Sequence, residues 1–527
     1  MSDSINDSKT INKKESWGDT LKLFLNPSVL TMLFLGFSAG IPILLIFSSL
    51  GLWLREAGVE RSAVTFFSWA ALGYSFKFVW APLVDKLPLP ILTRLLGRRR
   101  SWILLSQFAI ILAILWMSQT DPSNDESLTL MAIAAVLLGF SSATQDVVID
   151  AYRIESAETD LQALMSSTYI AGYRIGMLVA GAGALYLASF FGSEKGAYNY
   201  QAWEYSYMIM AGVMLVGVIT TLLIPEPAQS KDKSTQYSAD DYLRFLFLFI
   251  AIVIAFILTF YFSSDISKEL KSSLKVTLDN KHLANFIVAL IRLITAIAFA
   301  GLVAFVLVKA RLVNKAMVKE TYVAPVQDFF LRYGYSLAFL LLALIGLYRI
   351  ADIVLGVISN VFYQDLGFSK PEIASVVKTF GLLMTIVGGF LGGLLSVRFG
   401  VMRILFLGAL LSALTNLLFM ALAGAGYNMP MLYLVISADN LSAGLASAAF
   451  IAFLSSLTNI SFTAVQFAIF SSLMTLLPKI LGGYSGSMVD EVGYPNFFLI
   501  TAIMGIPVLV LIFIAGKKLE LKQNSEA

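Results

Sequence analysis

The chain has 527 residues, of which 58% are hydrophobic and only 13% are charged. Since a soluble domain averages about 25% charged residues, this composition indicates a protein that crosses a membrane many times. The net charge of +3, without dense basic tracts, argues against nucleic acid as a partner, and the absence of cysteine excludes disulfides, thiolate metal sites and cysteine nucleophiles.

The first part of the chain is predicted to form a bundle of six membrane-spanning helices over residues 28–225. Its apolar segments, each near the roughly 20 residues that a spanning helix needs, are 28–54, 62–86, 101–120, 128–152, 162–191 and 203–224. Residues 1–27 are polar and lack the short apolar core of a cleavable signal peptide. They are expected to be an N-terminal tail.

Residues 226–332 are predicted to be a linker that contains two further spanning helices, at 243–263 and 285–309. A second six-helix bundle is expected at 333–516, followed by a tail at 517–527. Its apolar segments are 335–361, 371–396, 403–424, 430–456, 462–488 and 495–515. The predicted fold is therefore all-α with fourteen spanning helices, and the inserted pair, which carries almost no charge in its apolar parts, is expected to face lipid.

Basic residues gather at one set of segment ends, and such residues mark the cytoplasmic side of a membrane protein. The arginines at 98–100 lie between the second and third segments, and the lysines at 517–518 follow the last one. With fourteen spans these positions all fall on one side, so both termini are predicted to be cytoplasmic. The only histidine, His282, falls on the opposite side and is expected to be a solvated loop residue.

The two six-helix blocks resemble each other in sequence. An acid, a glycine and a base follow the first segment of each block at the same spacing, pairing Glu56 with Asp365, Gly58 with Gly367 and Arg61 with Lys370. The fifth segments also align and place Arg174 on Lys479. Parallel repeats of this kind are related about the membrane normal and hold their substrate between them near the midplane.

Several stretches resemble a transporter family. Asp85 and Lys86, followed by the GRRR run at 97–100, are similar to the loop motif of the major facilitator superfamily. Within it the chain resembles the AmpG muropeptide permeases. The stretches that carry this resemblance are FKFVWAPLVDK (76–86), GRRRSWIL (97–104), SSATQDVVIDAYR (141–153), GYRIGMLVAG (172–181), YRIADI (348–353), KTFGLLMTIVGG (378–389), DNLSAG (439–444) and AVQFAIFSSL (464–473).

The resemblance implies a major facilitator fold and a permease of the bacterial inner membrane. Its cargo would be an anhydro-muropeptide, GlcNAc-1,6-anhydroMurNAc with or without peptide, taken from periplasm to cytoplasm for cell-wall recycling. The proton gradient would drive this import by alternating access, without a cofactor. Relatives of the AmpG proteins carry siderophores and acetyl-CoA, so another anionic solute such as a siderophore or an acyl-CoA is the alternative cargo.

Ten ionisable residues lie inside the apolar segments, where a charge costs at least about 2.5–3.5 kcal/mol on insertion scales. They are Lys77, Asp146, Asp150, Arg153, Arg174, Arg349, Asp352, Lys378, Asp439 and Lys479. Such residues usually face a water-filled path and mark function. Their depths predict two matched pairs, Lys77 with Asp146 and Lys378 with Asp439.

Cations at mid-depth suit an anionic solute, because an arginine can bind a carboxylate through two hydrogen bonds. The predicted substrate-binding residues are Lys77, Arg174, Arg349, Lys378, Lys479, Tyr74, Gln466 and Asn440. Asp146, Asp352 and Asp439 are the predicted proton carriers, because a desolvated carboxyl group beside a cation can gain and lose a proton near physiological pH.

Asp150 and Arg153 lie three residues apart near the predicted cytoplasmic end, where they are expected to form an ion pair that must break as the bundles rock. The full set of predicted gate residues is Asp85, Arg98, Arg99, Asp150, Arg153 and Arg398. The expected partners are an amino-sugar or peptide substrate, protons and the lipid bilayer. A chain with no cysteine and one histidine offers no metal site and little room for catalysis, so we do not expect an enzyme.

Overall fold

The computed structural model describes residues 22–59, 74, 76–156, 161–193, 197–227, 237–278, 281–369, 372–482 and 485–526. Within them the chain is almost entirely helical, and eleven helices are long and apolar enough to cross a membrane. These are Pro27–Leu44, Arg98–Ser118, Glu126–Ser156, Gln162–Phe190, Tyr200–Leu223, Asp240–Thr259, Lys315–Ser359, Ser375–Phe399, Val401–Ala425, Met429–Leu457 and Met488–Leu521. The all-α class is confirmed. The number fourteen stays a prediction, because most of the segment 62–86 lies outside the described residues and two other segments form shorter apolar helices, Ile294–Lys309 and Ile460–Thr475.

In the first helix of the first bundle, two neighbouring residues determine where the helix begins. The side chain of Asn26 accepts a hydrogen bond from the backbone of Ser28, and Pro27 occupies the first helical position, where its missing N–H costs nothing. The helices of this bundle are α2 (Pro27–Leu44), α3 (Leu50–Glu56), α6 (Ala81–Lys86), α7 (Leu92–Leu96), α8 (Arg98–Ser118), α9 (Asp125–Ser156), α10 (Gln162–Leu178), α11 (Ala184–Phe190), α12 (Tyr200–Val213) and α13 (Leu215–Leu223).

Glycines allow α2 and α10 to pack backbone against backbone. A Cβ at Gly36 would overlap the carbonyl oxygen of Tyr169, and a Cβ at Gly172 would overlap the carbonyl oxygen of Leu33. Small residues have this role in membrane proteins because they let two helices approach closely. The two helices are therefore a fixed unit of the first bundle.

The inserted region forms α15 (Ala239–Phe262), α16 (Ser264–Leu278), α17 (Lys281–Lys309) and the short α18 (Lys315–Val318). Large apolar side chains such as Phe247, Ile254 and Leu302 stay exposed on α15 and α17, which agrees with a surface that faces lipid. The expected loop around His282 is wrong, because the chain forms α16 before this residue and His282 itself lies in the first turn of α17. A run of good helix formers with few breakers explains α16.

The second bundle follows. Its helices are α19 (Ala324–Leu347, with a kink at Gly334), α20 (Ile350–Asp365), a π-helical segment (Ile373–Phe380), α22 (Gly381–Phe399), α23 (Val401–Ala425), α24 (Met429–Leu457), α25 (Thr463–Gly482) and α26 (Ser485–Glu526, with a kink at Gly493). Arg349 sits in the break between α19 and α20, with non-helical dihedral angles of φ −96° and ψ 12°.

The two bundles share the backbone geometry that ends their first segments. Gly58 and Gly367 have φ of +86° and +92°, a left-handed region that glycine adopts without steric cost. After each glycine, a backbone N–H returns to the carbonyl five residues back, from Val59 to Leu54 and from Phe368 to Tyr363. Left-handed glycines also precede α8 and α23 and separate the fifth and sixth helices, pairing Gly97 with Gly400 and Gly192 with Gly493. These equivalent positions support the duplication inferred from sequence.

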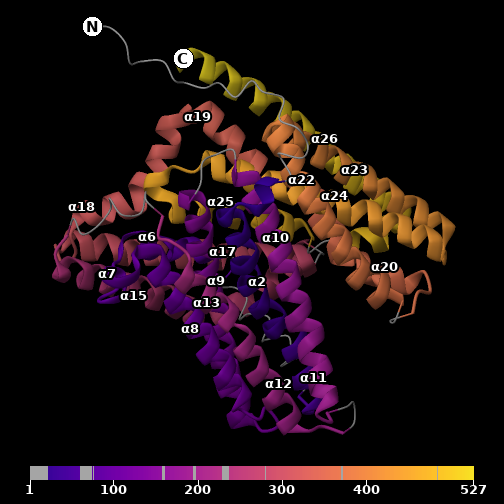
Figure 1. Ribbon diagram of the computed structural model, residues 1–527, viewed down its shortest axis with the longest axis horizontal. Coiled ribbons are helices and arrows are strands. Elements are labelled where there is room, and N and C mark those ends of the chain that lie inside the picture. The colour runs from indigo at the N-terminus through magenta and orange to yellow at the C-terminus, as the bar shows by residue number, and fades with distance from the viewer. Residues whose placement is uncertain are drawn as a thin grey trace.

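The bundles meet at one end of the molecule. In Figure 1 they come together around α10, α22 and α25 and run apart toward α12 in the first bundle and α20 in the second. Packing at the junction is close, since a Cβ at Gly393 of α22 would press on the Ser167 hydroxyl of α10. The junction lies at the end that carries the arginines at 98–100, which we call the basic end. The sequence predicts that this end is cytoplasmic.

Candidate functional site

A buried ion cluster joins the two bundles at the basic end. Its members, which we call the gate cluster, are Asp85, Arg99, Glu155 and Thr463. The Arg99 guanidinium, with no solvent exposure, lies 2.7 Å from a carboxylate oxygen of Asp85 and 2.7 Å from one of Glu155. It also donates a hydrogen bond of 2.8 Å to the hydroxyl of Thr463 in α25. Two carboxylates and one hydroxyl thus surround one buried arginine, as a charge in a low-dielectric site requires.

Asp85 also contacts the start of α25 directly. Its carboxylate accepts hydrogen bonds from the backbone N–H groups of Ala464, at 3.4 Å, and Val465, at 3.1 Å. The first N–H groups of a helix have no partner within the helix and carry a partial positive charge, so a carboxylate there is stabilising. Asp85 therefore links an arginine of its own bundle to a helix end of the other bundle.

A second contact between the bundles is made by Arg153. It is fully buried, lies 3.3 Å from Asp150 and donates a 2.7 Å hydrogen bond to the Ser455 hydroxyl of α24. Its guanidinium also lies 5.1 Å from the ring centroid of Phe467 in α25, within the range of a cation–π contact. The expected Asp150–Arg153 ion pair is present, and it reaches across to the second bundle.

The remaining predicted gate residues take different positions. Arg98 donates to the backbone carbonyl of Asp85 at 2.7 Å and so supports the cluster from one side. Arg398 lies at the exposed end of α22. Sequence analysis missed Glu155, Thr463 and a further acid, Glu226, which accepts backbone hydrogen bonds at the start of α8. Glu155 could have been found as an acid at the end of an apolar segment opposite the arginine run.

Further from the basic end, two arginines of opposite bundles, Arg174 and Arg349, lie near enough for their charges to interact. Arg174 of α10 is partly buried and has only a weak contact, 3.9 Å from the sulfur of Met177. Among the described residues no carboxylate lies within ion-pair distance of it. Arg349 is close enough for its charge to act on Arg174. Two like charges near one another inside a membrane protein are unfavourable unless an anion or water separates them.

Arg349 is held in place by its own bundle. Its guanidinium lies 3.0 Å from the Asp352 carboxylate and donates to the Ser447 hydroxyl. Asp352 also accepts a hydrogen bond from Ser412. Asp439 lies near Asp352 and accepts from Thr415 at 3.3 Å. Two of the predicted proton carriers thus stand beside a predicted substrate-binding arginine.

In the first bundle the ion pair of Lys77 is formed with Asp150, whereas its charge also acts on the predicted partner Asp146. Lys77 lies 3.7 Å from Asp150, one helical turn away from Asp146 on α9. Lys77 belongs to a short 3-10 helix, Lys77–Val79, rather than to a continuous α-helix, so a depth counted at α-helical rise does not apply to it. One oxygen of the buried Asp146 carboxylate has no hydrogen-bond partner among the described residues.

The predicted pairing of Lys378 with Asp439 is also not seen, because the described residues contain no ion pair between them. Lys378 lies in the π-helical segment Ile373–Phe380 and is exposed. A π-helix has more residues per turn than an α-helix, so the direction of its side chains departs from the spacing assumed for the sequence. The Lys378 side chain therefore points elsewhere than toward Asp439.

The other predicted binding residues already have protein partners. The Tyr74 hydroxyl shares a hydrogen bond with Ser142, and Asn440 accepts one from Thr385 at 3.0 Å. Gln466 bonds to Asp328 and to Arg332 at the basic end. The side chain of Lys479 lies outside the described residues.

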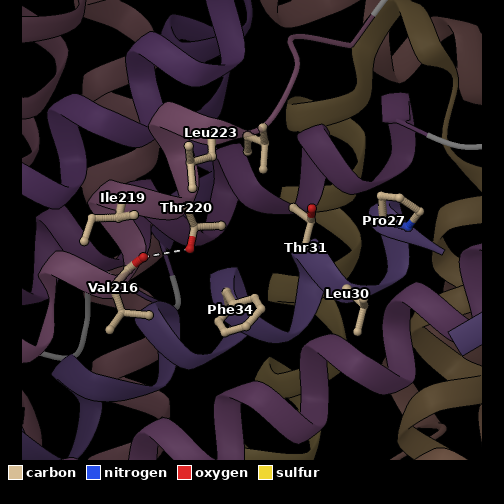
Figure 2. Close-up of a pocket in the computed structure, with 9 residues that line it drawn as sticks. Pro27, Leu30, Thr31, Phe34, Val216, Ile219, Thr220 and Leu223 are labelled. Atoms are coloured by element: carbon tan, nitrogen blue, oxygen red, sulfur yellow. Dashed lines mark hydrogen bonds between the residues drawn. The ribbon is translucent and has the colours of Figure 1, made fainter. Parts of the chain in front are cut away.

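The hollow shown in Figure 2 is of a different kind. It has a volume of about 410 Å³, lies between α2 and α13, and is lined by apolar side chains such as Leu30, Phe34 and Ile219. The hydroxyl of Thr220, which lines it, donates to the backbone carbonyl of Val216. A hollow without a charged side chain does not suit an anionic solute.

A match to a family model shows which protein family the chain belongs to. The model of the Major Facilitator Superfamily matches residues 23–362 and 340–527, which together cover nearly the whole chain. The chain belongs to this superfamily. Its members are transporters, so the expectation that the protein is not an enzyme is confirmed.

Individual proteins with similar sequences are also named as transporters or permeases. The Rickettsia conorii protein named "Putative transporter AmpG 4" is 28% identical over 94% of this chain and 98% of its own length. The Escherichia coli K12 "Anhydromuropeptide permease" is 28% identical over 95% of this chain and 82% of its own. The resemblance to AmpG proteins is thereby confirmed.

Among solved structures, the proton:xylose symporter XylE has a TM-score of 0.57 with 13% identity, over 94% of this chain and 95% of that one. FucP in its outward conformation has a TM-score of 0.55 with 13% identity, over 94% and 99%. At that identity these two structures establish the fold alone.

Proposed function

We propose that this protein imports anhydro-muropeptides, GlcNAc-1,6-anhydroMurNAc with or without peptide, across the bacterial inner membrane by proton symport. The name of the Escherichia coli relative, which aligns over 95% of this chain, supports the substrate class. The basic end would face the cytoplasm, with both termini on that side, as the positive-inside rule predicts.

The observation that carries this proposal is a pair of arginines, one from each bundle, whose charges lie near enough to interact. Arg174 has no carboxylate partner among the described residues, and the charge of Arg349 acts on it. A solute carboxylate would supply the anion that Arg174 lacks and reduce its repulsion with Arg349, which Asp352 already pairs. Arginine is the side chain best suited to bind a carboxylate through two hydrogen bonds. Binding would therefore draw the two bundles together around an anionic cargo.

Proton coupling would use the buried carboxyl groups. Asp146 has an oxygen without a hydrogen-bond partner among the described residues, so it has room to carry a proton. Asp352 bridges Arg349 to Ser412, and a proton on Asp352 would release the arginine for the substrate. Asp439, near Asp352, would be the third carrier in the second bundle.

Alternating access would separate the two bundles at the basic end. The contacts that must break are those of Asp85 with α25 and of Arg153 with Ser455. In the structure these contacts are made, so the basic end is closed. Cargo would then enter from the end predicted to be periplasmic.

The test is uptake into proteoliposomes of labelled GlcNAc-1,6-anhydroMurNAc under an imposed pH gradient. The unmodified protein should concentrate the disaccharide, and Arg174→Ala should lower uptake at least tenfold. Asp146→Asn should keep counterflow exchange but lose accumulation driven by the gradient. Arg403→Ala, which removes an exposed charge at the start of α23, is the matched control for Arg174→Ala. Absence of uptake and of binding by the unmodified protein would overturn the proposal.

A further inference from the structure

The inserted helices α15 and α17 carry a polar hollow that the transport path does not use. It has a volume of about 750 Å³ and lies where α15 begins and α17 ends. Four basic side chains line it, namely Arg244, Lys309, Arg311 and Lys315. Asn314, which precedes α18, donates a hydrogen bond to Asp241 of α15 at this place. Four cations around one hollow suit a phosphate group, and its volume leaves room for the rest of a larger ligand.

The acids around the hollow already have hydrogen-bond or ion-pair partners. Asp241, the acid that lines it, accepts hydrogen bonds from the backbone and hydroxyl of Ser238 at the start of α15, and a further one from Asn314. Arg244 lies 2.7 Å from Asp240, but both side chains are more than half exposed. An exposed pair of this kind contributes little, so Arg244 can turn to another anion.

The other three cations have no carboxylate partner within the described part of the chain. Lys309 lies over the ring of Phe305, 5.9 Å from its centroid. Arg311 has a left-handed φ of +58°, and its N–H and that of Leu312 return to the end of α17. Glycine is the usual residue at such a helix end, so an arginine there is unexpected on grounds of backbone geometry alone.

Apolar side chains lie next to the cations of the hollow, as expected where a protein meets the surface of a membrane. Phe305 and Val308 line it together with the cations. Along the same two helices, the side chains of Ile250, Ile297 and Val306 are exposed and apolar. A phosphate in the hollow would therefore continue into acyl chains that lie along α15 and α17. Basic pockets between spanning helices on the cytoplasmic side recognise anionic lipids in this way.

We propose that this hollow binds the phosphate of an anionic glycerophospholipid, such as phosphatidylglycerol or cardiolipin, with its acyl chains on α15 and α17. A bound lipid would also steady the connection between the bundles. Asn314 caps α18 by accepting from the backbone of Ala316 and Met317 and donates to Asp241 across the hollow.

The connection continues from α18 to the gate end of the second bundle. Glu320 accepts a hydrogen bond from Tyr237. At the start of α19, Asp328 and Arg332 bond to Gln466, which stands three residues after Thr463 in α25. Lipid at α15 and α17 would thus hold the linker that ends beside the gate cluster.

The experiment is native mass spectrometry of the full-length protein, delipidated in detergent and titrated with phosphatidylglycerol, cardiolipin or phosphatidylcholine. We expect the anionic lipids to bind at least tenfold more tightly than phosphatidylcholine. The double variant Lys309→Glu/Arg311→Glu should lose this preference. Lys271→Glu/Lys275→Glu, which makes the same charge change on α16 at the other end of α15, should keep it.

A second variant separates binding from folding. Arg311→Gly removes a cation while placing glycine at the left-handed position, so its Tm should be equal to or above that of the unmodified protein. Its affinity for phosphatidylglycerol should nevertheless fall at least threefold. Equal binding of all three lipids, equal losses in both double variants, or displacement of the lipid by millimolar inorganic phosphate alone would each overturn the proposal.

Discussion

Asp85 of the first bundle accepts a hydrogen bond of 3.1 Å from the backbone N–H of Val465, a residue 380 positions further along the chain. The same carboxylate lies 2.7 Å from the Arg99 guanidinium. One acid therefore neutralises a buried arginine and caps the start of α25 in the other bundle. When the bundles separate at this end, the hydrogen bond of Asp85 to α25 must break. The ion pair of Asp85 with Arg99 lies within the first bundle and can persist.

Asp85→Asn should weaken closure of the basic end, because an amide lacks the charge that favours both the arginine and the helix start. Since the sequence has no cysteine, a single Ser455→Cys can report accessibility of this interface to a thiol reagent. We expect labelling of that cysteine to be several-fold faster in the Asp85→Asn background. Asp365→Asn, which removes an acid at the opposite end, should leave the labelling rate unchanged.

Glu155→Gln should destabilise the protein strongly. It leaves the fully buried Arg99 with a single carboxylate partner, and breaking a buried pair costs about 3–5 kcal/mol because a charge is left uncompensated. The check is Tm in detergent, which should fall by several degrees. Thr463→Val, which removes only a neutral partner of the same arginine, should lower Tm clearly less. An unchanged Tm for Glu155→Gln would contradict the role of the gate cluster.

Gly172→Ala should disrupt the contact between α2 and α10. The added Cβ would overlap the carbonyl oxygen of Leu33, and backbone cannot move aside as a flexible side chain can. Overpacking of this kind costs about 1–3 kcal/mol. Gly212→Ala is the control, since nothing lies within 4 Å of its Cβ. It should be neutral or stabilising by about 0.5–1 kcal/mol, and both variants can be compared by thermal unfolding.

Lys77 should be energetically coupled to Asp150 more strongly than to Asp146. The structure has Lys77 and Asp150 3.7 Å apart, with no ion pair to Asp146 among the described residues. Double-mutant cycles with Lys77→Gln, Asp150→Asn and Asp146→Asn, read as Tm, should give the larger interaction for the 77–150 pair, within the roughly 0.5–3 kcal/mol of contacting residues. A larger coupling to Asp146 would restore the pairing inferred from sequence.

The lipid-facing hollow offers a prediction about transport. If a phospholipid at Arg311 and Lys309 steadies the linker, then uptake in liposomes of phosphatidylcholine alone should be slower than in liposomes that contain phosphatidylglycerol. The Lys309→Glu/Arg311→Glu variant should be equally slow in both. Its substrate affinity should stay unchanged, because neither residue lies near Arg174 or Arg349. A variant that still responds to phosphatidylglycerol would contradict the link.

Much of the architecture was predictable because a bilayer restricts the chain to apolar helices of a set length. The all-α class, the duplication at Gly58 and Gly367 and the ion pair of Asp150 with Arg153 follow from composition, spacing and local helix geometry. The depth of a side chain in the membrane, counted along its helix, was predicted less well than the helices themselves. It misplaced Lys77 and Lys378, because the chain departs from α-helical pitch in the 3-10 turn Lys77–Val79 and in the π-helical segment Ile373–Phe380.

By itself, the sequence determined which charges lie within apolar segments and which repeats carry them, since hydrophobic periodicity and residue order are local properties. Which charges meet was decided by tertiary structure alone. Glu155 and Thr463 share Arg99 across the two bundles because α9 and α25 pack together at the basic end. Arg174 comes near Arg349 because α10 packs against α22 and α24 of the second bundle. Contacts between residues hundreds of positions apart depend on how whole helices cross, which no single segment encodes.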